Sequence, residues 1–256
     1  MNCIPKVIHY CWFGGKEKPT LINKCIKSWK EKLPGYEIVE WNEKNFDINM
    51  SEFSKKAYED KKWAFVADYC RLWVLHNYGG IYLDTDVEVL KPIDDLLINK
   101  SFTGIEQDDQ IAFGVWGCTK GDKFLGKVLK YYNDLDYGKY KDELLKISIP
   151  VQITKLAKEL GYKQKKNKVV YFYDDIAVYP KDYFYPKRHS WEEAVITENT
   201  YSIHHYEGSW RSKRKIFRSK IKNLLVKNSF FNHLFLTNKF LIFDLNIFRL
   251  FLHDPS

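Results

Sequence analysis

The chain has 256 residues, of which 45% are hydrophobic and 17% aromatic, so its composition excludes an intrinsically disordered protein and allows one large core. The formal net charge is +8 at pH 7, and much of the basic excess lies in residues 209–229, which contain no acidic residue. No stretch has the ~18 uninterrupted apolar residues of a membrane-spanning helix, so we expect no such span.

The five cysteines are an odd number without a CxxC pair, and charged and polar residues interrupt the N-terminal segment. This pattern favours reduced thiols and argues against a disulfide framework or a signal peptide. We therefore expect a cytoplasmic protein.

The chain opens with a pattern typical of a β-α-β unit. Residues 6–13 form a β-branched and aromatic run that ends at a Gly-Gly pair, which predicts a strand followed by a loop. Apolar residues at helical spacing predict a helix over 20–33, and residues 36–42 read as a second strand.

A second helix and strand follow. Residues 63–78 place apolar side chains on a helical face and end at Gly79 and Gly80, after which residues 81–90 read as a strand. Strands that alternate with helices predict a largely parallel, doubly wound sheet, in which ligands bind beyond the carboxyl ends of the strands.

The second half of the chain is less regular. Residues 114–135 read as a strand, a turn and a helix, residues 150–162 as a helix, and residues 168–186 as one or two strands, so we expect the sheet to continue. The composition changes near Arg211, which predicts a folded domain over 1–210 and a basic, aromatic, helical tail over 211–256.

Two carboxylates, Asp84 and Asp86, end the run predicted as a buried strand. Neighbouring carboxylates repel at neutral pH unless a cation lies between them, and Mg²⁺ and Mn²⁺ take oxygen ligands from carboxylates and phosphates. The D-x-D pair therefore indicates a site for a metal and a diphosphate, although an exposed acidic strand end is the alternative for so short a motif.

Residues 64–86 follow the order A-x-x-x-D-x-x-R-x-x-x-L-x-x-x-G-G-x-Y-x-D-x-D, and "IPKVIHYCWFGG" at residues 4–15 and "IHHYEGSW" at 203–210 flank this segment. Together these segments resemble glycosyltransferase family 32, which includes yeast-type initiating mannosyltransferases, bacterial capsule and lipopolysaccharide transferases and, more distantly, the glucosylating domains of clostridial toxins. The resemblance covers about residues 4–210. It departs at residues 110–124, where relatives often carry an S-N-x-x-x-x-A segment that is missing here.

The resemblance implies a GT-A type α/β fold with a mostly parallel, Rossmann-like sheet flanked by helices. It implies a retaining glycosyltransferase that uses Mn²⁺ or Mg²⁺ to move a sugar from a nucleotide-sugar, with a UDP-sugar favoured, to a glycan or lipid-linked acceptor, as in bacterial capsular polysaccharide synthesis. A nucleotide-sugar hydrolase is the alternative. The basic tail alone would also allow a nucleic-acid or surface-binding module, but the acidic site disfavours it, and we expect no nucleic acid partner.

The same resemblance implies the metal ligands. Asp86 is expected to hold the metal most directly, with Asp84 acting through water or on the ribose and sugar hydroxyls. His205 is the expected third ligand because the His-aromatic-x-Gly element of related transferases places an imidazole on the cation. His204 is the alternative, and is otherwise expected to be a packed histidine.

Asp68 and Arg71 lie three residues apart on one face of the predicted helix, and in relatives such a pair contacts the donor sugar; a structural salt bridge is the alternative. With Asp84 and Asp86 they form the expected catalytic set. A retaining enzyme could use a carboxylate as the nucleophile on the sugar, and Asp108 and Asp109 are the nearest candidates. Front-face attack assisted by the leaving diphosphate, without such a carboxylate, is the alternative and stays open. The resemblance adds five further donor-binding residues: His9, Trp12 against the base, Tyr82, and Ser209 and Trp210 in a closing segment.

The tail over 211–256 alternates basic and apolar residues in its first part, which is typical of an interfacial helix. Each basic residue near an anionic surface contributes on the order of 1 kcal/mol. We expect peripheral contact with the inner face of an anionic cell membrane; the alternative is packing against the catalytic domain or a dimer contact.

Overall fold

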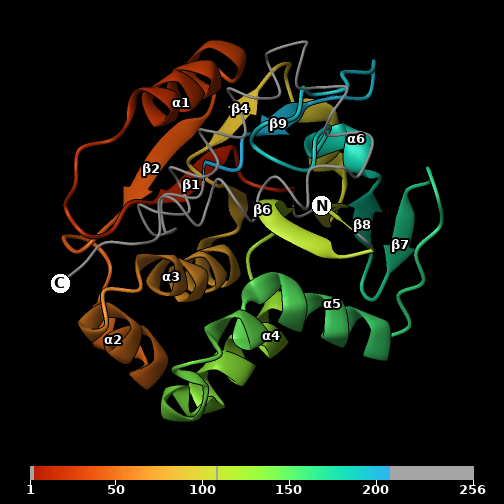
Figure 1. Cartoon of the computed structure of the whole chain (residues 1–256). Coiled ribbons are helices and arrows are strands. Elements are labelled where there is room, and N and C mark those ends of the chain that lie inside the picture. The colour runs from red at the N-terminus through yellow and green to blue at the C-terminus, as the bar shows by residue number, and fades with distance from the viewer. Residues whose placement is uncertain (1–2, 108, 208–256) are drawn as a thin grey trace, which may run out of the picture. The chain divides into compact units, whose positions relative to one another are not determined.

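The computed structural model describes residues 3–107 and 109–207 (Figure 1). By its contacts the chain divides into two units, one of Met1–Arg188 with Ala194–Trp210 and one of His189–Glu193 with Arg211–Ser256. The tail expected over 211–256 lies outside the described residues. No helix within the described part is long and apolar enough to cross a membrane.

A seven-stranded sheet forms the centre of the first unit, in the order β2-β1-β3-β6-β5-β8-β7. Strands β2, β1, β3, β5 and β8 run in one direction and β6 and β7 in the other. This confirms the predicted α/β class with a mostly parallel sheet. The strands are β1 Val7–Cys11, β2 Glu37–Trp41, β3 Gly80–Leu83, β5 Ser101–Ile105, β6 Ile111–Cys118, β7 Val170–Phe172 and β8 Ile176–Tyr179.

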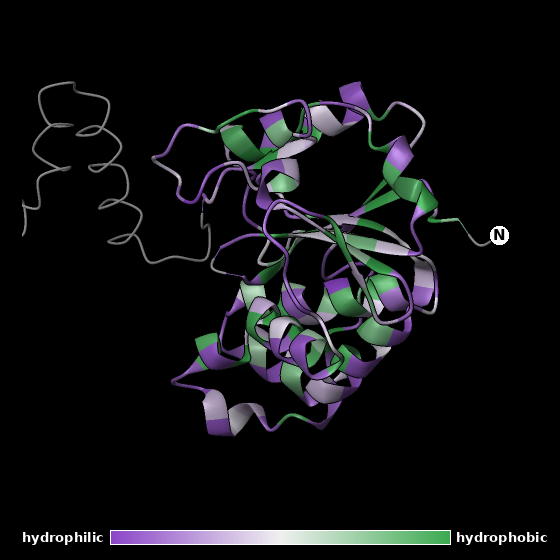
Figure 2. Ribbon diagram, turned by 90° about the vertical axis from the view of Figure 1, so that its right-hand side faces the viewer, coloured by the Kyte–Doolittle hydropathy of each residue, from purple (hydrophilic) through white to green (hydrophobic). Residues whose placement is uncertain are grey.

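Helices cover both faces of this sheet, as Figure 1 shows. One core packs α2, α3, α4 and α5 against the sheet, and the other packs α1 and α6 against its opposite face. Apolar residues gather in the strands and on the helix sides that face them, while hydrophilic residues dominate the outer turns (Figure 2). The helices are α1 Thr20–Lys32, α2 Glu52–Glu59, α3 Trp63–Tyr78, α4 Lys123–Asp134, α5 Ile149–Glu159 and α6 Lys181–Phe184, with four short 3₁₀ turns at Ile48–Met50, Asp94–Ile98, Tyr137–Tyr140 and Leu144–Ile147.

The strand predicted over residues 81–90 is two strands. β3 ends at Leu83, and after a turn the chain enters β4, Val87–Val89, which pairs antiparallel with β9, Ser202–His204, in a separate two-stranded sheet. The prediction of one strand was wrong because the aspartates occupy a turn that redirects the chain away from the central sheet. This turn brings residues 202–204 next to the D-x-D pair.

Helix α3 connects directly to β3, and two glycines make this connection possible. Gly79 has φ +69°, and a Cβ atom there would lie 2.6 Å from the backbone nitrogen of Lys120. At Gly80, with φ +98°, a Cβ atom would lie 2.8 Å from the carbonyl oxygen of Val7. Only glycine fits both the left-handed backbone and the close approach, so the helix can end and the strand begin without a loop.

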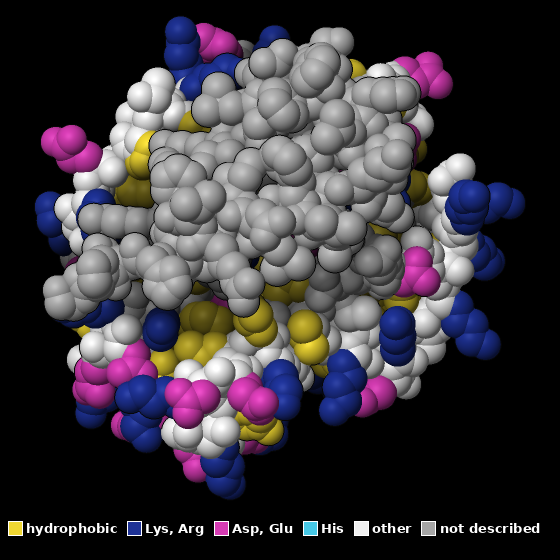
Figure 3. Space-filling view, in the orientation of Figure 1, with side chains coloured by type: hydrophobic (Ala, Val, Ile, Leu, Met, Phe, Trp, Pro, Cys, Tyr) yellow, Lys and Arg dark blue, Asp and Glu magenta, His cyan; other side chains and the backbone are white. Residues whose placement is uncertain are grey.

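The surface of the described part carries charges of both signs. On the face shown in Figure 3, Lys and Arg alternate with Asp and Glu along the lower rim. Two pairs, Lys130 with Asp134 and Lys146 with Glu143, are neighbours along helical turns and lie 2.6 Å and 2.7 Å apart. This mixed surface differs from the uniformly basic sequence of residues 209–229.

Candidate functional site

The D-x-D turn lies at the carboxyl end of β3. The backbone N–H of Asp84 donates to the carbonyl of Gly114 on β6 at 2.8 Å, which continues the sheet ladder to the turn. A Cβ atom at residue 114 would lie 3.0 Å from Oδ2 of Asp84, so a glycine leaves room for this carboxylate against β6. The carboxylate therefore lies on the edge of the sheet where ligands of doubly wound folds bind.

Arg71 joins two of the three carboxylates expected in the catalytic set. Its Nη1 lies 3.1 Å from Oδ1 of Asp84, and its Nη2 lies 3.1 Å from Oδ1 of Asp68. Tyr82 donates its hydroxyl to Oδ1 of Asp84 at 3.2 Å, and the guanidinium lies 4.7 Å from the centre of the Tyr82 ring. The Asp68–Arg71 pair is thus an ion pair that also fixes Asp84.

Burial changes the acidity of this network. Asp68 and Arg71 are 8% and 9% exposed. Burial raises the pKa of the Asp68 carboxyl to about 6, although the Arg71 charge acts in the opposite direction. Asp68 therefore takes up a proton closer to neutrality than an ordinary aspartate does.

His204 faces the second aspartate. Its Nε2 lies 3.1 Å from Oδ1 of Asp86, and Oδ2 of Asp86 accepts the backbone N–H of Glu207 at 2.8 Å. Burial opposes both charges, but the pairing outweighs it, lowering the pKa of Asp86 to about 2 and raising that of His204 to about 9. At neutral pH the two side chains form a buried ion pair.

His205 points to a different partner. Its Nε2 lies 2.8 Å from Oε2 of Glu88, and its Nδ1 lies 3.5 Å from Nζ of Lys187. Successive side chains along a strand point to opposite faces, so only one of the adjacent histidines can face the aspartates. The structure places His204 there, where His205 was expected, and metal ligation stays a prediction for both.

The arrangement of Asp68, Arg71, Asp84 and Asp86 lies in a segment with known relatives. Residues 19–103 match the family described as "Glycosyltransferase sugar-binding region containing DXD motif". This match spans about a third of the chain, and this segment is similar to a DXD-type sugar-binding region. The match ends at residue 103, so it does not include His204 and His205.

Curated proteins also match parts of the chain. The chain is 33% identical over 138 residues to inositol phosphoceramide mannosyltransferase 3 of Schizosaccharomyces pombe, which covers 50% of this chain and 36% of that protein. It is 24% identical over 184 residues to human alpha-1,4-N-acetylglucosaminyltransferase, which covers 69% of this chain and 52% of that protein. The chain thus spans about a third to a half of the length of these relatives.

The fold has a solved counterpart. The PaToxG glycosyltransferase structure superposes with a TM-score of 0.51 over 62% of this chain and 71% of that chain, at 19% sequence identity. Identity this low informs on the fold alone. The fold is of the GT-A type, as the sequence predicted.

The family implies a divalent cation at the sugar-binding region, and the donor atoms fit one. Carboxylate oxygens of Asp84 and Asp86 and an imidazole nitrogen of His204 are ligands that Mn²⁺ accepts. Within residues 3–107 and 109–207, however, no three His, Cys, Asp or Glu side chains form a ready-made cation site. Arg71 and His204 neutralise the aspartates here, so a cation would have to exchange with the proton that His204 carries.

Glu106 is a site residue that the sequence reasoning missed. It follows β5 directly, as Asp84 follows β3, and its N–H donates to the carbonyl of Gln110 at 3.0 Å in the turn to β6. Burial raises the pKa of Glu106, and the charges of His204 and Asp84 act on it in opposite directions. Of the two candidates named in this turn, Asp109 is exposed with φ +65°, and Asp108 lies outside the described residues. A carboxylate directly after a buried strand was the signal available.

The other expected donor residues differ in their surroundings. His9 is 3% exposed; its Nδ1 lies 3.1 Å from Nε1 of Trp41 and its Nε2 lies 3.0 Å from the carbonyl of Gly79. Both ring nitrogens are thus used inside the fold, and the expected contact of His9 with the donor stays a prediction.

Trp12 is half-buried after β1 and donates Nε1 to the carbonyl of Lys16 at 2.6 Å. Its contact with a nucleotide base stays a prediction. Tyr82 lies beneath Asp84, where its hydroxyl supports the carboxylate. Ser209 and Trp210, expected in the closing segment, lie outside the described residues.

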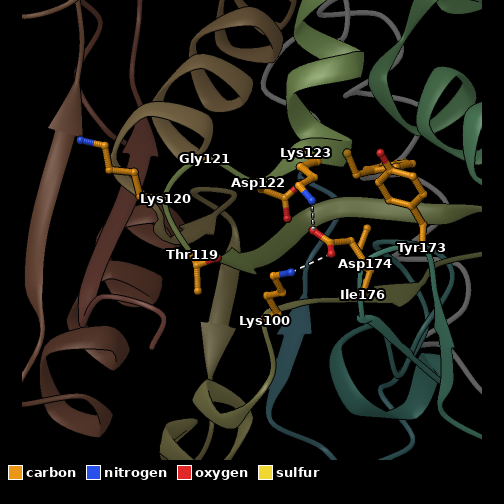
Figure 4. A pocket seen from close by; sticks show the side chains of 10 residues that line it. Lys100, Thr119, Lys120, Gly121, Asp122, Lys123, Tyr173, Asp174 and Ile176 are labelled. Carbon is orange, nitrogen blue, oxygen red and sulfur yellow. Dashed lines mark ion pairs between the residues drawn. The ribbon is translucent and has the colours of Figure 1, made fainter. Parts of the chain in front are cut away.

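A cavity of about 330 Å³ lies at the opposite edge of the sheet, where β5 and β8 begin (Figure 4). Lys100 and Lys123 line it, and both pair with Asp174, at 2.7 Å and 3.8 Å. None of the predicted site residues lines this cavity. The cavity is therefore separate from the D-x-D turn at the carboxyl end of β3.

Proposed function

We propose that the chain is a metal-dependent retaining glycosyltransferase that moves a sugar from a nucleotide-sugar to a glycan or lipid-linked saccharide. The observation that carries the proposal is the cluster at the carboxyl end of β3, where Arg71 holds Asp84 and His204 holds Asp86. Two ionised carboxylates held in place at a ligand-binding edge suit a cation–diphosphate group.

Each residue of the cluster has a separate task in this reaction. Arg71 fixes the orientation of Asp84, and the Tyr82 hydroxyl supports the same oxygen. The backbone N–H of Glu207 holds the second oxygen of Asp86, which ties residues 204–207 to the site. A bound divalent cation would neutralise the charge that develops on the departing nucleoside diphosphate.

The relatives support the class of reaction and not one sugar. The names of the two proteins specify a mannosyltransferase and an N-acetylglucosaminyltransferase, so donor and acceptor differ between them. We propose a UDP-sugar donor, Mn²⁺ or Mg²⁺ as the cation, and a role in bacterial surface polysaccharide synthesis in the cytoplasm, with peripheral contact at the inner face of the cell membrane.

A donor screen tests this proposal. The purified chain is incubated with Mn²⁺ and a panel of UDP- and GDP-sugars, with and without saccharide acceptors and excess chelator, and released nucleoside diphosphate is measured. We expect release from one donor, faster with an acceptor and lost in chelator. Release that no acceptor accelerates and that yields only free sugar would favour the hydrolase, and no release from any donor would refute the proposal.

A further inference from the structure

Strand order sets the direction in which a bound nucleotide-sugar extends. β1 leads to Trp12, β3 leads to Asp84 and β5 leads to Glu106, with β6 between β3 and β5. Neighbouring strands are about 4.8 Å apart, so the ends of β3 and β5 are separated by about 10 Å. A diphosphate at Asp84 whose nucleoside lies toward β1 therefore directs its sugar toward β5.

Glu106 lies at the carboxyl end of β5 and has no cationic side chain paired with it in the described part of the chain. It is nevertheless half-buried and lies in the field of Asp84 and Asp86. The charge of His204, which is paired with Asp86, offsets this repulsion only in part. An unpaired carboxylate beside two others does not contribute to folding, which is typical of a group kept for a ligand.

Two polar atoms beside Glu106 also lack partners. The Tyr206 hydroxyl and Nδ1 of His204 are buried, and neither has a hydrogen-bond partner among the described residues. Their rings lie side by side, with centres 4.2 Å apart, and Tyr206 is 8% exposed. Buried polar groups are nearly always paired, so these two atoms point to a polar ligand.

Tyr206 is held in this place by an unusual backbone. Its φ is +57°, a left-handed conformation that a bulky residue rarely adopts. Its hydroxyl approaches the Glu106 carboxylate without reaching hydrogen-bond geometry.

We propose that Glu106 recognises the sugar ring of the donor by accepting hydrogen bonds from its hydroxyl groups, while the Tyr206 hydroxyl bonds the same ring and covers it. A carboxylate offers only acceptors and sugar hydroxyls offer donors, so the two match. This inference rests on the proposed function and deepens it, because it names the residues that distinguish a nucleotide-sugar from its nucleoside diphosphate.

The test compares two ligands on the full chain. Three pairs of ligands are available: UDP with UDP-glucose, UDP with UDP-N-acetylglucosamine, and GDP with GDP-mannose. The pair whose nucleotide-sugar the wild type turns over is chosen, and the affinity for each member of that pair is measured by calorimetry with Mn²⁺. The variants are Glu106→Gln and Tyr206→Phe. Glu37→Gln is the matched control, since Glu37 is an exposed carboxylate on β2 at the far edge of the same sheet.

We expect Glu106→Gln to bind the nucleoside diphosphate within about twofold of wild type and the nucleotide-sugar at least about tenfold more weakly, because a charged acceptor is lost. Tyr206→Phe should weaken only the binding of the nucleotide-sugar, and by less than Glu106→Gln does. Glu37→Gln should change the affinity for neither ligand. If Glu106→Gln does not fold by thermal melting, Glu106→Asp keeps the charge and should show the same selective loss in smaller degree.

The inference would be overturned if Glu106→Gln lowered the affinity for both ligands equally, or if a folded Glu106→Gln variant kept its affinity for the nucleotide-sugar. The proposed function would stand in either case. If wild type binds and turns over none of the donors, the proposed function itself fails and the inference falls with it.

Discussion

The adjacent residues His204 and His205 make different contacts. Because Nε2 of His204 lies 3.1 Å from Asp86 and His205 bonds Glu88, replacing them should have unequal effects. We predict that His204→Ala weakens the affinity for UDP with Mn²⁺ by about tenfold or more, and that His205→Ala changes it by less than about threefold. Calorimetric titration measures both. The reverse ranking would restore His205 as the ligand and contradict the geometry.

His9 predicts a dependence of stability on pH. Burial lowers its pKa from 6.5 to about 4, so the unfolded chain binds the proton first as the pH falls. The stability that the neutral ring contributes is present above pH 6.5 and is lost as the pH falls toward 4. Between pH 7 and pH 5 this loss is about 2 kcal/mol for His9 alone.

The variant His9→Gln keeps an amide that can donate to Gly79 and accept from Trp41, but it does not titrate. Its free energy of unfolding should therefore fall less between pH 7 and pH 5 than that of wild type, as measured by urea denaturation at both values. Parallel losses in the two proteins would show that His9 is not the group responsible.

At the scale of elements, the α3–β3 connection depends on Gly79. Alanine there would need a left-handed backbone and would bring Cβ within 2.6 Å of a backbone nitrogen. We predict that Gly79→Ala lowers the free energy of unfolding by about 2–4 kcal/mol. Gly35→Ala is the matched control, since a Cβ atom there meets nothing within 4 Å, and it should change stability by less than about 1 kcal/mol. Similar effects of the two substitutions in chemical denaturation would contradict this explanation.

The elements also show how much the sequence could predict. The helix expected over 63–78 matches α3, because its apolar spacing and its Gly-Gly end are local signals. The first strand and the helix over 20–33 were likewise predicted from local patterns. The break between β3 and β4 was not, because it depends on pairing with β9, more than a hundred residues later.

The same distinction applies to the site. Asp68, Arg71, Asp84 and Asp86 lie in one contiguous segment, and the structure brings Arg71 to both Asp68 and Asp84. The choice between His204 and His205 required the register of β9, which no local pattern contains. Glu106 was missed for a related reason: β5 was not recognised, so its carboxylate was not seen to follow a strand.

For the whole molecule, the tail over 211–256 carries a separate prediction. Its alternation of basic and apolar residues predicts binding to anionic membranes. In vesicle flotation, the full chain should bind anionic vesicles and not neutral ones, and a chain truncated after residue 210 should bind neither while it retains donor turnover. Equal binding of the two proteins, or none by either, would remove the membrane role and leave the transferase proposal intact.

The central claim is that Asp84 and Asp86 hold the donor diphosphate through a divalent cation. Titration of UDP, with GDP in parallel, into wild type and into Asp84→Asn/Asp86→Asn tests it most directly, with Mn²⁺ and with excess chelator. We predict binding by wild type with Mn²⁺, weakened about 100-fold or more by chelator and to the same extent by the double variant, whose far-UV circular dichroism should match wild type. Undiminished binding in chelator, or by the folded double variant, would contradict the claim.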